Sequence, residues 1–198
     1  MAEDSAHNLF NEDFQQYRRS IEQTKLKIVI LGPGRQGPGY YKRVEIRKHL
    51  RSLSKTDDVA FPEEITVPSE ILPDEGHWSS TDFIVANAQI VFALLIDHRD
   101  VTGVLGEVTK YGYLKGFRDK SFLILPKERK KAKGSRLPQI LAAAEDYPKN
   151  RTLRYSDEEF RSCVLTRDYV AAKVDVYRKR LCWDEFMKKA GMTTFEYS

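Results

Sequence analysis

The stretches KIVILGPGR (residues 27–35) and DHRDVTGVLGEV (residues 97–108) decide the fold of this chain. The first is an apolar, β-branched run that leads into a glycine-rich turn, as a buried strand does at its carboxyl end. The second follows another apolar run and opens a helix that carries Glu107. Ligands of open α/β sheets bind at the carboxyl ends of the strands, so the two stretches together predict one binding site.

Short apolar runs alternate with helical segments along most of the chain. Strands are expected at residues 26–31, 58–61, 90–96, 121–125 and 152–155, and helices at 41–54, 78–87, 104–114, 137–146 and from 157 onward. This βα alternation predicts an α/β fold, a five-stranded parallel sheet covered by helices on both faces. Ser156 and Glu159 have the spacing of a capping box, which predicts the start of the last helix.

An extra helix is expected before the sheet. Phe10, Phe14, Tyr17 and Ile21 recur at spacings of four, three and four residues, which is the period of an amphipathic helix. We therefore expect an N-terminal amphipathic helix over residues 1–24 and a single α/β domain over residues 25–198.

Composition narrows the classes of function. The chain has 198 residues, a net charge of +4 and no apolar stretch long enough to span a bilayer, so we expect no membrane and a cytoplasmic protein. The two cysteines, Cys163 and Cys182, both fall in expected helices, and no metal site is indicated. The basic run at residues 127–136 has no interleaved aromatic residues, so it indicates a solvated loop and does not favour nucleic acid.

The turn after the first strand, LGPGRQGPGY (residues 31–40), lacks the features of two common nucleotide-binding motifs. It contains no G-x-G-x-x-G that opens directly into a helix and no Walker lysine, which argues against a dinucleotide dehydrogenase and a P-loop enzyme. Clustered glycines still let backbone N–H groups approach an anionic or sugar ligand, and Gly32 and Gly34 are the candidates. The alternative is a crossover loop that binds nothing.

Glu107 is the candidate catalytic residue. Gly103 precedes it by one helical turn, and small residues there open space above the third strand while the carboxylate points into it. A glutamate in an early helical turn is also a favourable partner for the helix dipole, and this alternative needs no ligand.

These motifs, in this order, resemble the nucleoside 2-deoxyribosyltransferases and their Rossmann-like relatives, the TIR-type NAD hydrolases and SLOG nucleotide-binding domains. The likeness covers roughly residues 26–165 and rests on LGPG (residues 31–34), VAFPEEI (residues 59–65) and GVLGEV (residues 103–108). It implies a Rossmann-like, flavodoxin-like nucleotide-binding domain in which Glu107 is the nucleophile. It also implies a ligand that is NAD or a nucleotide, a homo-oligomer or a partner protein, and a role in antiviral defence.

Further residues are assigned around this glutamate. Asp97 and Asp100 are candidate catalytic acids beside Glu107, since a purine or pyrimidine leaving group needs a proton and the nicotinamide of NAD does not. The candidate ligand-binding residues are Gly32, Gly34, Arg35, Tyr40, Arg43, Pro62, Trp78 and Gly103. Tyr40 and Trp78 offer stacking surfaces, and Arg35 and Arg43 offer phosphate contacts. No cofactor is expected, because NAD would be a substrate.

Three functions remain open on this basis. The first is an enzyme that cleaves N-glycosidic bonds through Glu107, because a carboxylate below an anomeric carbon can stabilise or attack an oxocarbenium ion. The second is a SLOG-like module that binds a nucleotide signal without turnover. The third is a regulatory or scaffolding subunit that docks a partner through its N-terminal helix.

Overall fold

The computed structural model describes residues 2–35, 37, 39–72, 79–96, 102–127, 135–156, 158–159 and 164–191, with backbone alone for residues 2–11 and 164–165. Its strands are β1 (Lys27–Leu31), β2 (Asp58–Ala60), β3 (Ile90–Leu94), β4 (Ser121–Pro126) and β5 (Thr152–Tyr155). Its α-helices are α1 (Ala2–Gln23), α2 (Tyr40–Leu53), α3 (Ser80–Asn87), α4 (Thr102–Tyr113), α5 (Lys115–Arg118), α6 (Leu137–Ala144) and α8 (Val164–Lys189). Short 3-10 helices are η1 (Pro62–Glu64), η2 (Ser69–Ile71) and η4 (Lys149–Arg151).

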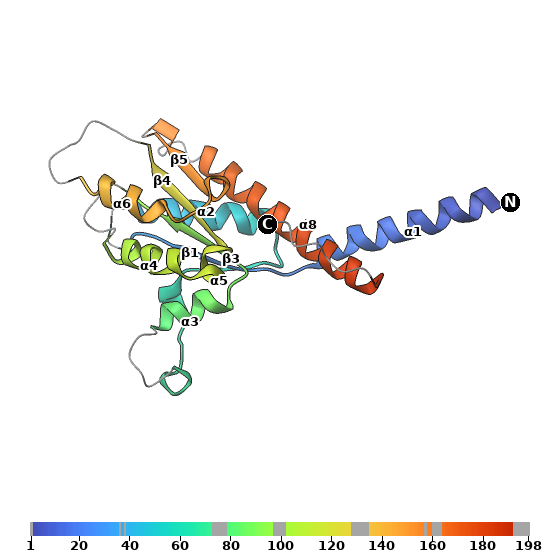
Figure 1. The fold of residues 1–198 in the computed structure, drawn as a ribbon, viewed down its shortest axis with the longest axis horizontal. Helices are drawn as coiled ribbons and strands as arrows, with labels where there is room; N and C mark the ends of the chain where they lie inside the picture. Colours follow the sequence, from blue (N-terminus) through green and yellow to red (C-terminus); the bar gives the residue numbers. More distant parts are fainter. Residues whose placement is uncertain are drawn as a thin grey trace. The chain divides into compact units, whose positions relative to one another are not determined.

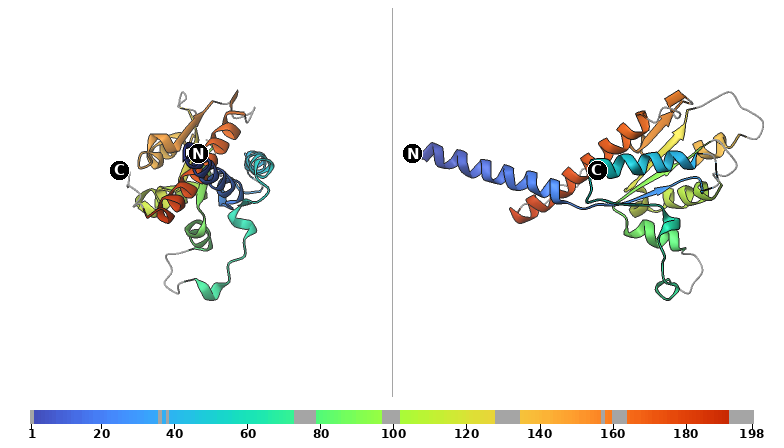
Figure 2. Two further views of the ribbon diagram at one scale, coloured as in Figure 1. Left: turned by 90° about the vertical axis from the view of Figure 1, so that its right-hand side faces the viewer. Right: turned by 180° about the vertical axis from the view of Figure 1, so that it is seen from behind.

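The five strands form one parallel sheet in the order β2-β1-β3-β4-β5. This confirms the predicted α/β class, and the order is the flavodoxin-like one. The helices lie on both faces of the sheet, with α2 on one side and α4 and α6 on the other (Figures 1 and 2). Because β1 lies between β2 and β3, the chain leaves β1 toward one side of the sheet and continues from β3 toward the other. The crevice between those two connections is where this fold binds ligands.

The core consists of the central strands and the helix faces that cover them. All five residues of β3 and all six of β4 are buried, as expected for strands covered on both faces. The predicted capping box is confirmed: the Ser156 backbone N–H donates to the Glu159 carboxylate, and the Glu159 N–H donates to Ser156 Oγ at 3.3 Å. Within the described part of the chain, no helix has the length and apolar character required to cross a membrane.

The chain divides into two compact units. The larger is Leu26–Ala171, which contains the whole sheet, and the smaller combines residues 1–25 with the chain from Ala172 onward. The smaller unit joins α1 to the part of α8 from Ala172 onward. The division expected from the sequence, a helix over residues 1–24 and one domain over residues 25–198, stays a prediction about domains; by contacts, the end of α8 groups with α1.

Candidate functional site

A cavity lies at the carboxyl ends of β1 and β3, in the crevice expected from the strand order. Its volume is about 440 Å³, which falls within the range of roughly 300–1,000 Å³ that is typical of small-molecule sites. The residues that line it are Leu31, Gly32, Gly34, Arg43, Pro62, Glu63, Ile65, Ser80, Thr81, Ile84, Gly103, Val104 and Glu107. Six of them were assigned from the sequence, namely Gly32, Gly34, Arg43, Pro62, Gly103 and Glu107.

One side of the cavity is built around Arg43 of α2, which is almost completely buried, with 1% of its surface exposed. Its Nη1 and Nη2 donate to both carboxylate oxygens of Glu63, at 2.8 and 3.0 Å. They also donate to the carbonyl oxygens of Ile30 and Pro33, each at 2.8 Å. Both terminal nitrogens are thus engaged with the protein, so Arg43 holds η1 against the end of β1. The phosphate contact expected from Arg43 would require these bonds to break.

Gly32 is needed where the chain leaves β1, because Arg43 passes directly beside it. A Cβ added to Gly32 would lie 2.8 Å from Arg43 Cδ, a distance that real Cβ atoms do not show. Gly34 differs, since a Cβ there would meet no atom within 4 Å. Gly32 therefore serves the wall of the cavity, and Gly34 leaves space inside it.

The opposite side of the cavity carries Glu107, one turn into α4. Burial, together with the nearby negative charge of Asp82, raises the pKa of the Glu107 carboxyl to about 7. The positive charge of Arg43 and a hydrogen bond with Thr81 act in the other direction. Glu107 forms no ion pair with any described residue. It therefore presents to the cavity a carboxyl that is half charged near neutral pH.

Asp82 is a further acid on this side that the sequence analysis did not single out. It is 2% exposed, and it accepts hydrogen bonds from the Ser79 N–H at 2.6 Å and from Lys110 Nζ at 2.7 Å. Burial opposes its charge, but the hydrogen bonds from Lys110 and Ser79 hold the pKa of Asp82 below its usual value. Asp82 therefore remains negative and disfavours a second negative charge on Glu107.

The remaining predicted residues fall into two groups. Tyr40 and Arg35 do not line the cavity: the Tyr40 ring packs edge-on against Phe61 with centroids 5.9 Å apart, and Arg35 is exposed. Asp97, Asp100 and Trp78 lie outside the described residues. Within the described part, no group of three His, Cys, Asp or Glu side chains converges in a way that could hold a metal ion.

The lining residues missed from the sequence are chiefly Glu63, Ser80, Thr81 and Ile84. Ser80, Thr81 and Ile84 line the cavity because the amino-terminal half of α3 faces it. The only sequence signal for this helix start was its capping box. Ser79 Oγ accepts from the Asp82 N–H while Asp82 accepts from the Ser79 N–H, which defines the start of α3. A capping box predicts where a helix begins in the sequence, but not which part of the fold that end of the helix faces.

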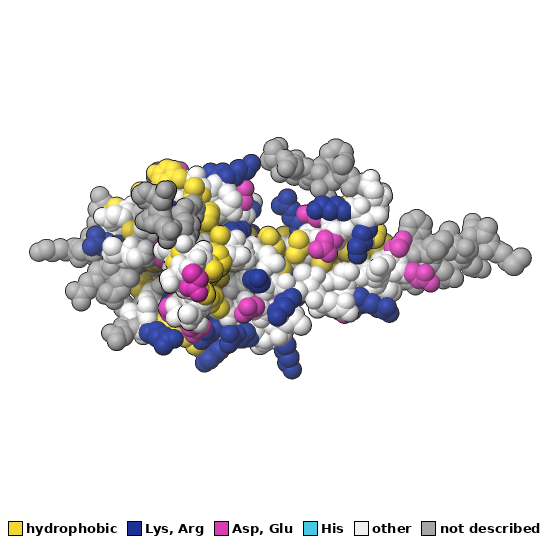
Figure 3. Space-filling view, turned by 90° about the horizontal axis from the view of Figure 1, so that it is seen from below, with side chains coloured by type: hydrophobic (Ala, Val, Ile, Leu, Met, Phe, Trp, Pro, Cys, Tyr) yellow, Lys and Arg dark blue, Asp and Glu magenta, His cyan; other side chains and the backbone are white. Residues whose placement is uncertain are grey.

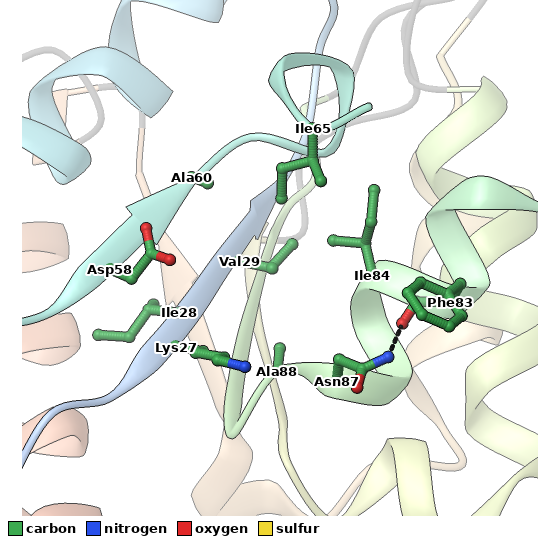
Figure 4. A pocket seen from close by; sticks show the side chains of 10 residues that line it. All are labelled: Lys27, Ile28, Val29, Asp58, Ala60, Ile65, Phe83, Ile84, Asn87 and Ala88. Atoms are coloured by element: carbon green, nitrogen blue, oxygen red, sulfur yellow. Dashed lines mark hydrogen bonds between the residues drawn. The ribbon is translucent and has the colours of Figure 1, made fainter. Parts of the chain in front are cut away.

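A second, smaller cavity of about 200 Å³ adjoins the first along the face of β1 and β2 (Figure 4). Ile65 and Ile84 line both cavities, so these two side chains form their common wall. The floor is formed by Val29, Ala60 and Ala88, and polar groups stand at the far end, where the strands begin. This second cavity, the groove behind Ile65 and Ile84, extends the site along a mostly apolar surface.

Comparison with solved structures finds nine similar chains, among them the following two. One is a 2-deoxyribosyltransferase from the psychrotolerant bacterium Bacillus psychrosaccharolyticus, with 19% identity, 69% of this chain and 89% of that chain covered, and a TM-score of 0.40. The other is a conserved protein from Enterococcus faecalis V583, with 16% identity, coverage of 72% and 88%, and a TM-score of 0.39. No family model and no curated protein matches the sequence. Both likenesses concern the fold, at 19% and 16% identity.

Proposed function

We propose that this protein cleaves the N-glycosidic bond of a nucleoside-type substrate, NAD or a nucleotide, with Glu107 below the anomeric carbon. The observation that carries the proposal is the difference between the acids around the cavity. Glu63 is paired with Arg43 and Asp82 with Lys110, whereas Glu107 lines the cavity without an ion pair to any described residue. A carboxylate that lacks a counter-charge is stabilised when positive charge develops in front of it.

The chemistry follows from that placement. As the C–N bond breaks, its electron pair leaves with the base, and the anomeric carbon acquires oxocarbenium character. The Glu107 carboxylate stabilises this cation, or its oxygen forms a bond to the carbon and yields a glycosyl ester. Water, or the hydroxyl or nitrogen of an acceptor, then bonds to the anomeric carbon, displaces the carboxylate and gives up its proton to the departed base or to solvent. Bonds break and form with electron pairs and no net oxidation or reduction occurs, so no redox cofactor is required.

The leaving group divides the substrates into two classes. A purine or pyrimidine needs a proton as it departs, while the nicotinamide of NAD leaves neutral. Asp97 and Asp100 are the acids proposed to supply that proton. The ligand contacts are proposed to come from Gly32, Gly34, Pro62 and Gly103, while Arg35, Tyr40 and Trp78 stay candidates from the sequence alone.

The test is to incubate the purified protein with NAD and, separately, with a mixture of nucleosides and nucleotides, and to follow free base by chromatography. Glu107→Gln is expected to lower the turnover rate at least ~100-fold, since glutamine keeps the shape of the side chain but not its charge. Glu45→Gln, on an exposed ion pair of α2, is the control and should retain activity. Full turnover in Glu107→Gln would exclude the catalytic role.

A different outcome would favour a nucleotide-binding module. If no substrate is cleaved and a nucleotide stays with the protein through gel filtration, the cavity serves recognition without turnover. In that case Glu107→Gln should leave binding unchanged or strengthen it, because a phosphate-bearing ligand gains from the loss of a negative charge nearby.

A further inference from the structure

The smaller unit, formed by α1 and the part of α8 from Ala172 onward, is a helix pair joined by an aromatic cluster. Tyr17 of α1 lies edge-on to Trp183 and Phe186 of α8, with ring centroids 5.9 and 6.1 Å apart. The Tyr17 hydroxyl donates to the Lys179 carbonyl oxygen at 2.9 Å, and Thr24 contacts Cys182. These contacts run antiparallel, since higher positions on α1 meet lower positions on α8.

The pair does not cover its own apolar residues. Phe14, Val176 and Trp183 are 69%, 62% and 49% exposed. Phe14 is three residues before Tyr17 and therefore shares its face of α1, and Val176 is two turns before Trp183 and shares its face of α8. Because Tyr17 touches Trp183, all four residues lie on the same side of the pair. We call this side, made of Phe14, Tyr17, Val176 and Trp183, the aromatic face.

Packing within the pair is also incomplete. A cavity of about 310 Å³ lies between the two helices, with Tyr17 and Phe186 among its lining residues. A two-helix unit of this length has little core of its own, and most helical stability in proteins comes from tertiary packing of an apolar face. A further element against the aromatic face would supply that packing.

The charges of the smaller unit indicate which kind of element packs against the aromatic face. The residues of the smaller unit, 1–25 and 172–198, carry nine Lys or Arg and nine Asp or Glu, so the +4 of the whole chain resides in the rest of the protein. Both signs border the aromatic face, with Arg18 paired to Glu22 on α1 and Lys179 paired to Asp175 on α8. Apolar side chains and both kinds of charge lie together along this part of the surface (Figure 3). A neutral, mixed border suits an identical surface and offers no attraction to a polyanion or an anionic membrane.

We propose that the aromatic face is a self-association surface, on which a second copy of this chain places its own α1 and α8 to form an intermolecular four-helix bundle. Two antiparallel pairs packed face to face around a two-fold axis give a common bundle arrangement. The second part of α8 is about 27 Å long and two helices are about 20 Å wide, so each copy can bury roughly 500 Å². The total reaches ~1,000 Å², the lower bound for a specific interface.

The test is sedimentation velocity of the full chain over a wide range of protein concentrations. The wild type should form a dimer that dissociates on dilution, and Phe14→Glu/Trp183→Glu should sediment as a monomer. Tyr113→Glu is the matched control, because Tyr113 is a 76% exposed aromatic on α4, outside the helix pair. It should dimerise like the wild type.

A milder variant guards against misfolding of the double mutant. Val176→Lys changes an exposed position, so its circular dichroism should match that of the wild type while its dimer dissociation constant rises ~10-fold or more. A wild type that is monomeric at every concentration, or a dimer that survives both changes, would overturn the proposal. Binding of a monomer to phosphatidylglycerol vesicles through these residues would assign the face to a lipid surface and would overturn it as well.

Discussion

The two sides of the cavity place a glutamate in opposite electrostatic environments, one paired with a cation and one not. On the side of β1 and α2, Glu63 is bound by Arg43, whose terminal nitrogens also satisfy backbone carbonyls at the end of β1. On the side of α4, Glu107 has burial and the charge of Asp82 against its ionisation, and no cation bound to it among the described residues. The first side stabilises a turn, and the second keeps a carboxyl at a cost to stability.

Under the proposed function, this difference separates a structural charge, Glu63, from a catalytic one, Glu107. A carboxylate that is already paired gains little from a ligand, whereas one without a partner gains when a cation forms beside it. Sites that serve function commonly contain such locally unfavourable groups. If the comparison is right, changes on the Arg43 side should affect folding and changes on the Glu107 side should affect pH behaviour and turnover.

The largest effect on stability is expected from Arg43→Met. It leaves the carbonyl groups of Ile30 and Pro33 and the partly exposed Glu63 carboxylate without their donor, and each buried acceptor that loses its donor costs about 1–3 kcal/mol. Guanidinium chloride denaturation measures the change. Arg47→Met is the matched control, since Arg47 pairs with Glu64 at a more exposed position of the same helix. It should cost about 1 kcal/mol, and equal losses in both variants would remove the special role of Arg43.

The next effect is a gain in stability from Glu107→Gln at alkaline pH. The folded-state pKa of Glu107 is about 7 against an ordinary 4.5, so the folded state holds this proton more tightly than the unfolded state. The wild type therefore loses stability as pH rises from 4.5 through 7, and the loss is complete above pH 7. The variant avoids it and should be more stable by roughly 1–3 kcal/mol at pH 8, but not at pH 4. Urea denaturation at both pH values, with Glu45→Gln as control, tests this; a pH-independent difference would contradict it.

A smaller effect is expected in the pH dependence of turnover. Because the proposed role of Glu107 requires its carboxylate form, kcat/KM should rise with pH through about 7. Asp82 raises the Glu107 pKa, so Asp82→Asn should move this rise to lower pH by about one unit or less. The exposed Asp175→Asn is a charge-matched control and should leave the profile in place. A shift to higher pH in Asp82→Asn would mean that Asp82 does not act through its charge.

Much of this architecture can be predicted from the sequence because the signals are local. Apolar runs such as residues 90–96 identify strands, and all five strands and the first four helices that follow them were expected at nearly their observed bounds. Residue 157, where the last helix was expected to begin, lies outside the described residues. Gly32 and Glu107 could be assigned to one site because parallel strands bring their carboxyl ends to the same edge. The short helix α5 and the 3-10 helices carry no strong periodicity and were not expected.

What could not be predicted depends on contacts between distant segments. Arg43 reads as a phosphate ligand on a helix near a glycine turn, and only the approach of Glu63, twenty residues later, shows that its donors are used. Thr81 reads as an ordinary first-turn residue until the end of α3 is placed beside α4. Tyr40 has the chemistry of a stacking residue, yet it packs against Phe61 instead.

The smallest expected effect concerns the empty space beside Glu107. A Cβ added to Gly103 or to Gly106 would meet no atom within 4 Å, so either glycine tolerates alanine, and the helix should gain up to ~1 kcal/mol. Gly103 lines the cavity and Gly106 is not among its lining residues. Gly103→Ala should therefore raise KM several-fold while Gly106→Ala leaves it unchanged. Because both substitutions add one methyl group to the same helix, a difference between them measures ligand contact and not helix stability; equal KM values would place the ligand away from Gly103, nearer the groove behind Ile65 and Ile84.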